Sequence, residues 1–167
     1  KLESNGEIVF QNITLGVAWA SILVDSNSDG GPEKLVTVMN ISGSYYLIYY
    51  DVTSSVLSET TSQSILGQSS CLVAFDLIDG IGYDGEEIFV GVGDNVSAYT
   101  SSGARFEIVR FSEGAVSSIE GAIITESEKG LLCGIPDGTL VLLNETLDRV
   151  SSTLISNAPI TIIMSFE

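Results

Sequence analysis

The chain has 167 residues, with 22 acidic and 6 basic side chains and no histidine, so its formal net charge is −16 at pH 7. A surface this acidic repels phosphate backbones, which argues against nucleic acid as a partner and favours divalent cations. The absence of histidine removes the commonest general base and transition-metal ligand, which argues against hydrolase and zinc chemistry. A mean hydropathy of +0.36 predicts a folded core, and no apolar run is long enough for a membrane span.

Taken in order, the chain is expected to form short strands separated by turns. Short apolar runs rich in β-branched and aromatic residues favour strands, whereas no segment carries the spacing of an amphipathic helix. The expected strands are 6–12, 17–24, 34–40, 44–52, a weak one near 56–57, 72–75, 88–92, 95–100, 104–111, 122–125, 131–135, 139–144, 149–155 and 160–166.

The strand pattern repeats. Asp25, Asp76 and Glu126 occupy equivalent positions, 51 and 50 residues apart. A repeat of about 50 residues with four strands is typical of a propeller blade. The predicted fold class is all-β, a single domain over 1–167 with about three four-stranded antiparallel blade-like repeats. Their approximate bounds are 17–66, 67–117 and 118–158.

The two ends of the chain are predicted to be unpaired strands, 6–12 and 160–166. About three repeats do not close a ring of blades, so the chain is a propeller fragment, a protomer completed by copies, or another all-β fold. Unpaired apolar strands are templates for a neighbouring chain, which predicts a homo-oligomer formed by terminal-strand pairing. The alternative is that the two strands pair with each other. Because it begins at Lys1, the chain is expected to be a mature form or part of something larger.

An oxygen-rich loop, residues 25–33, lies between two apolar runs and reads Asp-Ser-Asn-Ser-Asp-Gly-Gly-Pro-Glu. Calcium takes about six to eight oxygen ligands, and alternate side chains of a tight loop can converge on it. The expected ligands are the side chains of Asp25, Asn27, Asp29 and Glu33 and the carbonyl of Gly31. The alternative interpretation is an Asx-rich hairpin turn without metal.

The order of an apolar strand, this loop, a second apolar strand and an aromatic strand ending in aspartate resembles the FG-GAP repeats of integrin α subunits. These calcium-loop β-propeller repeats have VCBS-type bacterial relatives. Residues 21–38 give the nearest match and residues 82–92 a looser one. The resemblance implies a propeller fold and places the calcium ligands on the same five residues. The Phe-Gly…Gly-Ala-Pro signature of the family is absent.

A second acidic loop follows the strand at 72–75. Asp76, Asp79, Asp84 and Glu87 could gather a cation there, although their spacing departs from the family pattern. The corresponding third loop is too short to bind a metal. Clustered acids can also run glycoside hydrolysis, with Asp76 and Asp84 or Glu86 and Glu87 as pairs, but such clusters are more often cation ligands or solvated loops.

Cysteines, sequons and tyrosines give weaker indications. Cys71 and Cys133 are expected to be buried free thiols rather than a disulfide. Asn12, Asn40, Asn95 and Asn144 lie in Asn-x-Ser/Thr sequons, which favours a secreted, glycosylated protein. Tyr45, Tyr46, Tyr49 and Tyr50 are expected to pack between sheets rather than bind a glycan or a partner.

Taken together, the sequence predicts a non-enzymatic, extracellular or cell-surface module that is stabilised by Ca²⁺. Its expected role is structural or adhesive, in a ring, surface layer or filament of copies. The alternative is a propeller fragment acting as a protein- or glycan-binding platform, either extracellular or as an intracellular scaffold. A carbohydrate-active enzyme ranks below both.

Overall fold

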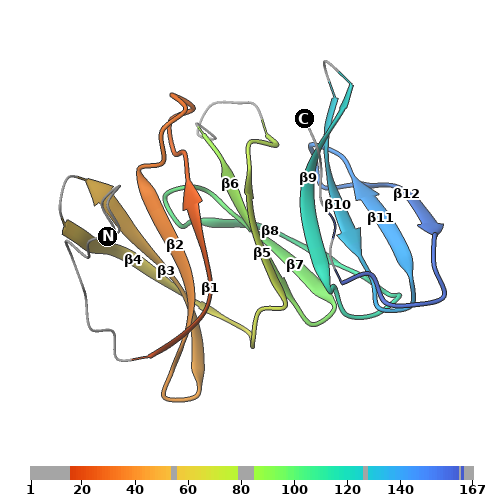
Figure 1. Ribbon diagram of the computed structural model, residues 1–167, viewed down its shortest axis with the longest axis horizontal. Helices are drawn as coiled ribbons and strands as arrows, with labels where there is room; N and C mark the ends of the chain where they lie inside the picture. The colour runs from red at the N-terminus through yellow and green to blue at the C-terminus, as the bar shows by residue number, and fades with distance from the viewer. Residues whose placement is uncertain (1–15, 54–55, 79–84, 126–127, 162, 164–167) are drawn as a thin grey trace, which may run out of the picture.

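A computed structural model describes residues 16–53, 56–78, 85–125, 128–161 and 163. It contains twelve strands in three four-stranded antiparallel sheets, which Figure 1 shows side by side. The first sheet comprises β1 (Val17–Val24), β2 (Lys34–Ile41), β3 (Ser44–Thr53) and β4 (Val56–Ile65). The second comprises β5 (Cys71–Phe75), β6 (Glu87–Val92), β7 (Asn95–Tyr99) and β8 (Arg105–Arg110). The third comprises β9 (Ser118–Thr125), β10 (Glu128–Gly134), β11 (Thr139–Leu143) and β12 (Arg149–Leu154).

Each sheet is a meander in which neighbouring strands follow one another in the sequence. The connections are tight hairpins where the sequence supplies a positive φ. At the β2–β3 turn, Ser42 and Gly43 have φ values of 54° and 88°, as the favoured two-residue hairpin turn requires. The first strands of the sheets contact one another, β1 with β5 and β5 with β9. This arrangement, with first strands innermost, is that of propeller blades and confirms the predicted fold class.

The core lies between the sheets. Val36, Leu47 and Tyr49 of the first sheet pack against Ile88 and Tyr99 of the second. The opposite face of the second sheet packs against the third in the larger cluster, which contains Leu77, Phe89, Val96, Ala98, Leu131, Cys133, Val141 and Leu143. The second sheet is therefore covered on both faces, which explains why its central strands carry apolar residues at consecutive positions.

The junction between the second and third sheets is closest at Gly121 of β9. A Cβ added there would overlap the ring of Phe75 on β5. The two inner strands approach this closely because one of them has no side chain at the contact.

The four tyrosines of β3 are divided between its faces, as expected. Tyr45 and Tyr49 pack in the cluster between the first two sheets, and Tyr46 and Tyr50 lie in a separate cluster with Met39. Tyr49 is fully buried and Tyr50 nearly so. Packing between sheets is therefore found for Tyr45 and Tyr49, whereas the cluster of Tyr46 and Tyr50 contains only residues of the first sheet.

Several sequence expectations differ from the structure. The strand expected at 122–125 begins four residues earlier, as β9. Residues 56–65 form the full strand β4, not a weak strand followed by a loop. Its polar residues lie on an outer strand whose backbone pairs with β3, so burial is not needed to hold it extended. At the C-terminus, residues 160, 161 and 163 belong to no strand, whereas 6–12 and the rest of 160–166 lie outside the described residues.

Candidate functional site

The acidic loop between β1 and β2 is held in shape by its own side chains. The Asp25 carboxylate accepts hydrogen bonds from the N–H groups of Asn27 (3.2 Å) and Gly30 (2.7 Å). Asn27 Oδ1 accepts the N–H of Asp29 at 3.0 Å, and Asp29 Oδ1 accepts that of Gly31 at 3.0 Å. Gly30 has φ of 88°, so it makes the sharp turn that the sequence predicts.

Three of the predicted calcium ligands converge in this loop. Asp25, Asp29 and Glu33 each offer a carboxylate oxygen, and these oxygens lie within 4.8 Å of one another. Calcium–oxygen distances are about 2.3–2.6 Å, so oxygens this close can share one ion. Asn27 turns its amide to the loop instead, since its Nδ2 donates to Asp29 Oδ2 at 3.2 Å. The donor set of hard carboxylate oxygens fits calcium, but such groups also occur without a metal.

Glu86 links the loop to the second sheet. From the sequence, Glu86 was expected only as one member of a possible catalytic pair with Glu87. The N–H of Asp25 donates to Glu86 Oε2 at 2.8 Å, and the N–H of Glu86 donates to the carbonyl of Asp25 at 2.8 Å. Gly85, with φ of 81°, lies so close to the backbone of Ser26 that a Cβ would overlap it.

The acidic groups around Asp25 and Glu86 have shifted pKa values. Slight burial raises the pKa of Asp25, but the hydrogen bonds from Gly30 and its neighbours outweigh it and hold that pKa below its usual value. The pKa of Glu86 is raised, first by burial and then by the charges of Asp25, Asp76 and Glu33, although the N–H of Asp25 opposes this. A cation bound here would relieve this repulsion.

The second predicted cation site is only partly described. Asp79 and Asp84 lie outside the described residues, so the site stays a prediction. Asp76 Oδ2 receives Lys129 Nζ at 3.1 Å. The carboxylates of Glu86 and Glu87 accept hydrogen bonds from different segments, Glu86 from Asp25 and Glu87 from Leu77.

Glu87 is a buried carboxyl group, 1% exposed, at the start of β6. Its Oε2 accepts the N–H groups of Leu77 at 2.9 Å and Ile78 at 3.1 Å, and its Oε1 has no hydrogen-bond partner among the described residues. Burial raises its pKa to about 7, with a contribution from the charge of Asp76 and against the two backbone hydrogen bonds. Glu87 therefore organises the start of the second loop and costs stability when it ionises.

Three of the four sequon asparagines and both cysteines lie among the described residues. Asn40 is on β2, Asn95 on β7 and Asn144 just after β11, and each is partly exposed; Asn12 lies outside the described residues. Both cysteines are free, as expected. Burial raises the pKa of the Cys71 thiol, and burial together with the neighbouring Cys71 raises the pKa of Cys133 to about 12. Neither thiol has the lowered pKa of a nucleophile.

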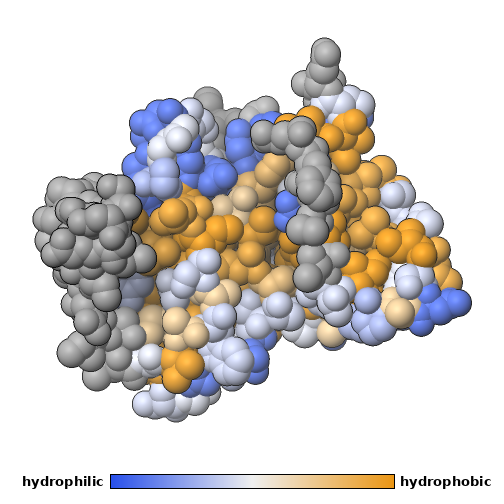
Figure 2. Space-filling view, viewed as in Figure 1, coloured by the Kyte–Doolittle hydropathy of each residue, from blue (hydrophilic) through white to orange (hydrophobic). Residues whose placement is uncertain are grey.

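Within the described residues, the second sheet covers one face of the third sheet, and no sheet covers the other. We call the uncovered side, which points away from the second sheet, the open face. Side chains alternate along a strand, so the neighbours of the buried Leu131, Cys133, Val141 and Leu143 point to it. They are apolar and only partly buried or exposed: Ala122, Ile124, Leu132, Leu140 and Leu142, with Val150 beside them. Figure 2 shows apolar surface over β10 to β12.

The open face of the third sheet is equivalent in strand register to the face of the second sheet that the third sheet covers. On the second sheet, the cross-strand pair Phe89–Ala98 lies under the third sheet and is at most 1% exposed. The third sheet places Leu132–Leu142 at the equivalent pair. This position was missed because β11 is apolar at nearly every residue, which predicts burial on both faces rather than exposure on one.

The chain also enters the second and third sheets in the same way. The N–H of Ser70 donates to the carbonyl of Gly91 at 2.8 Å, and that of Ser117 donates to Gly134 at 2.9 Å. Ser70 Oγ donates to the carbonyl of Val116, and Ser117 Oγ donates to that of Ile160. Ile160 therefore occupies the position relative to the third sheet that Val116 occupies relative to the second.

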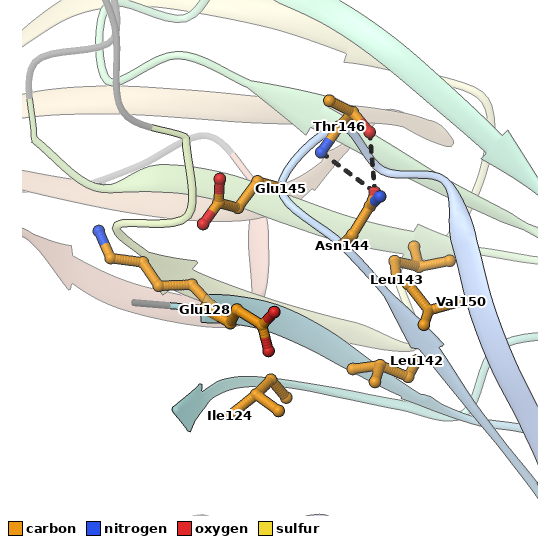
Figure 3. A pocket seen from close by; sticks show the side chains of 9 residues that line it. Ile124, Glu128, Leu142, Leu143, Asn144, Glu145, Thr146 and Val150 are labelled. Atoms are coloured by element: carbon orange, nitrogen blue, oxygen red, sulfur yellow. Dashed lines mark hydrogen bonds between the residues drawn. The ribbon is translucent and has the colours of Figure 1, made fainter. Parts of the chain in front are cut away.

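A groove of about 440 Å³ opens at the end of the open face where β9 meets β10 and β11 meets β12. Figure 3 shows the side chains that line it. Ile124, Leu142 and Val150 are apolar. In this view the carboxylate of Glu128 lies just above Ile124, and that of Glu145 lies higher, to the left of Leu142 and Val150. Asn144 is committed to its own turn, where Oδ1 accepts the N–H of Thr146 at 3.1 Å. The groove combines an apolar floor with two carboxylates.

Among the described residues, no helix is long and apolar enough to cross a membrane. No model of a protein family matches the sequence, and no curated protein matches it. Solved structures of BBS1N, a β-propeller domain, in complex with ARL6DN resemble the chain. The structure from a crystal soaked with lead has a TM-score of 0.55 and 12% identity, over 84% of this chain and 48% of that chain. The one from a crystal soaked with mercury has a TM-score of 0.52 and 17% identity, over 91% and 58%. The chain thus spans about half the length of these structures, and the likeness shows that its sheets are arranged as propeller blades.

Proposed function

We propose that this chain is a non-enzymatic part of a β-propeller that binds another protein through the open face of its third sheet. The observation that carries the proposal is the Leu132–Leu142 pair, which remains partly exposed in the register where Phe89–Ala98 is buried. Apolar surface that is built like an interior contact favours a binding role. The BBS1N structures are complexes with a protein partner, which supports such a role for this type of fold.

A library of random peptides displayed on phage tests this proposal. We expect the chain to enrich peptides that are lost on the variant Ile124→Asn/Val150→Asn, which makes the exposed part of the open face polar while leaving the buried core unchanged. The matched control is Leu66→Asn/Ile108→Asn, on exposed residues outside the groove. Enrichment that is equal on both variants would contradict the proposal.

A second candidate is the self-assembling extracellular module. The exposed Trp19 and Leu23 on β1 favour it, because they leave apolar surface at the other end of the row of sheets. In that function the chain would be a glycosylated structural or adhesive protein. Light scattering on the purified chain that is used in the phage experiment separates the two candidates. Large homopolymers support self-assembly, and a monomer supports the binding platform.

We further propose that the loop at 25–33 binds calcium as a stabilising ion, as its resemblance to FG-GAP repeats implies. An ion bound only by the folded chain raises stability by mass action, so excess chelator is expected to lower the melting temperature and calcium to restore it. Differential scanning calorimetry of wild type and Asp29→Asn measures this. The variant should lose most of the response, because it removes one of three convergent carboxylates.

The control for the calcium prediction is Asp137→Asn, in the short β10–β11 turn. Its Oδ1 accepts the N–H of Thr139 at 2.8 Å, which an asparagine oxygen can also do. This variant should respond to calcium as wild type does. An identical melt of wild type in chelator and in calcium would refute the metal site.

A further inference from the structure

The groove on the open face has the size of a site for one or two apolar side chains. Its volume of about 440 Å³ lies within the range of about 300–1,000 Å³ that is usual for binding pockets. Ile124 and Val150 are 45% and 59% exposed, and Leu142 lies between them on the face. An occupant would therefore bury apolar surface without displacing any part of the core.

The charges beside the groove are negative. The side chains of Glu128 and Glu145 both line it, and within the described residues neither forms an ion pair with a cation. Lys129 also lines the groove, but its Nζ lies 3.1 Å from Asp76 Oδ2 on the second sheet, so its charge is offset there. A ligand in the groove meets two carboxylates in a chain whose net charge is −16.

We propose that the partner of the open face is a polypeptide segment in which large apolar side chains alternate with or adjoin lysine or arginine. This inference rests on the proposed binding function of the open face and adds the chemistry of the partner. The apolar side chains would enter between Ile124, Leu142 and Val150, and the basic groups would lie beside Glu128 and Glu145. A second copy of this chain fits less well, because it would bring a strongly acidic molecule against these carboxylates.

Fluorescence polarisation with three synthetic peptides tests the inference. The peptides share two leucines separated by one residue and differ only in carrying lysine, glutamine or glutamate at the flanking positions. The lysine peptide is expected to bind about fivefold more tightly than the glutamine peptide, and the glutamate peptide most weakly. High salt should reduce the difference, because the charges are exposed.

A pair of matched double variants separates the groove carboxylates from the general charge of the chain. Glu128→Gln/Glu145→Gln should bind the lysine and glutamine peptides equally. Glu59→Gln/Glu107→Gln removes the same charge from the exposed faces of β4 and β8 and should keep the fivefold preference. An equal preference in both variants overturns the inference, because the attraction would then come from the whole acidic surface.

The remaining outcomes distinguish this inference from the function on which it rests. If all three peptides bind equally and Ile124→Asn/Val150→Asn abolishes binding, the binding function stands and the basic partner is wrong. If that variant changes no affinity, both are wrong. If light scattering shows a dimer that the variant dissociates, the open face is occupied by a second copy, which also overturns the basic partner.

Discussion

Replacing Gly121 with valine is expected to lower the free energy of unfolding by about 1–3 kcal/mol, the usual range for overpacking a core. The Cβ of any larger residue would overlap the ring of Phe75, and that ring lies in the core between the second and third sheets. Valine favours strands, so a loss of stability cannot be attributed to strand propensity. The effect therefore measures how closely β5 and β9 must approach.

Denaturant unfolding of wild type, Gly121→Val and Ala122→Val measures this effect. Ala122 is the next residue on β9 and points to the open face, so its replacement by valine should change stability by less than about 0.5 kcal/mol. Combining Gly121→Val with Phe75→Ala should cost less than the sum of the two single changes, because they share one contact. Additive effects would show that the ring of Phe75 is not what excludes a side chain at position 121.

The largest pH effect is expected at Glu87, whose pKa in the folded chain is about 7 against an ordinary value of 4.5. Between these values the folded chain keeps a proton on Glu87 that the unfolded chain has released. Stability therefore falls as pH rises from about 4.5 to about 7, and the full cost is present above that range. One pKa unit corresponds to about 1.4 kcal/mol. Glu87→Gln should raise the free energy of unfolding by about 1–3 kcal/mol at pH 8 and change it little near pH 5.

Glutamine suits this test because its side-chain oxygen can accept the N–H groups of Leu77 and Ile78 as the carboxylate does. Its amide nitrogen would lie where Oε1 lacks a partner, which limits the gain. The measurement is the difference between variant and wild type in chemical denaturation across this pH range. Glu107→Gln, on the exposed side of β8, is the control. A difference for Glu87→Gln that does not change with pH would contradict the raised pKa.

The strands of this fold could be predicted where side chains report burial. Runs such as Tyr-Tyr-Leu-Ile-Tyr-Tyr in β3 are apolar on both faces, because the strand lies between two clusters. Only the start of β4, near 56–57, could be predicted, because the rest of the strand is held by backbone pairing with β3 and carries mainly polar side chains. Sequence patterns detect buried surface, and an outer strand has little of it.

In the candidate site, too, only features that lie within one segment of the sequence could be predicted. Asp25, Asp29 and Glu33 could be predicted because their spacing lies within one loop. The link from Asp25 to Glu86 joins residues 61 positions apart, so no local pattern contains it. The open face could not be predicted either, because β11 is apolar at nearly every residue and this pattern is the same whether or not a second sheet covers the face. Only the position of the neighbouring sheet distinguishes the two cases.

The serial arrangement of the three meanders has a consequence for how the chain unfolds. Among the described residues, the strands of each sheet pair with one another and each sheet packs against its neighbours in the row. Cooperativity is therefore expected to pass from one sheet to the next rather than through a common centre. The second sheet gains from two junctions, whereas the third has one junction and the open face. Partial opening is therefore cheaper at either outer sheet than at the second, and a partner bound to the open face would raise the protection of β9 to β12.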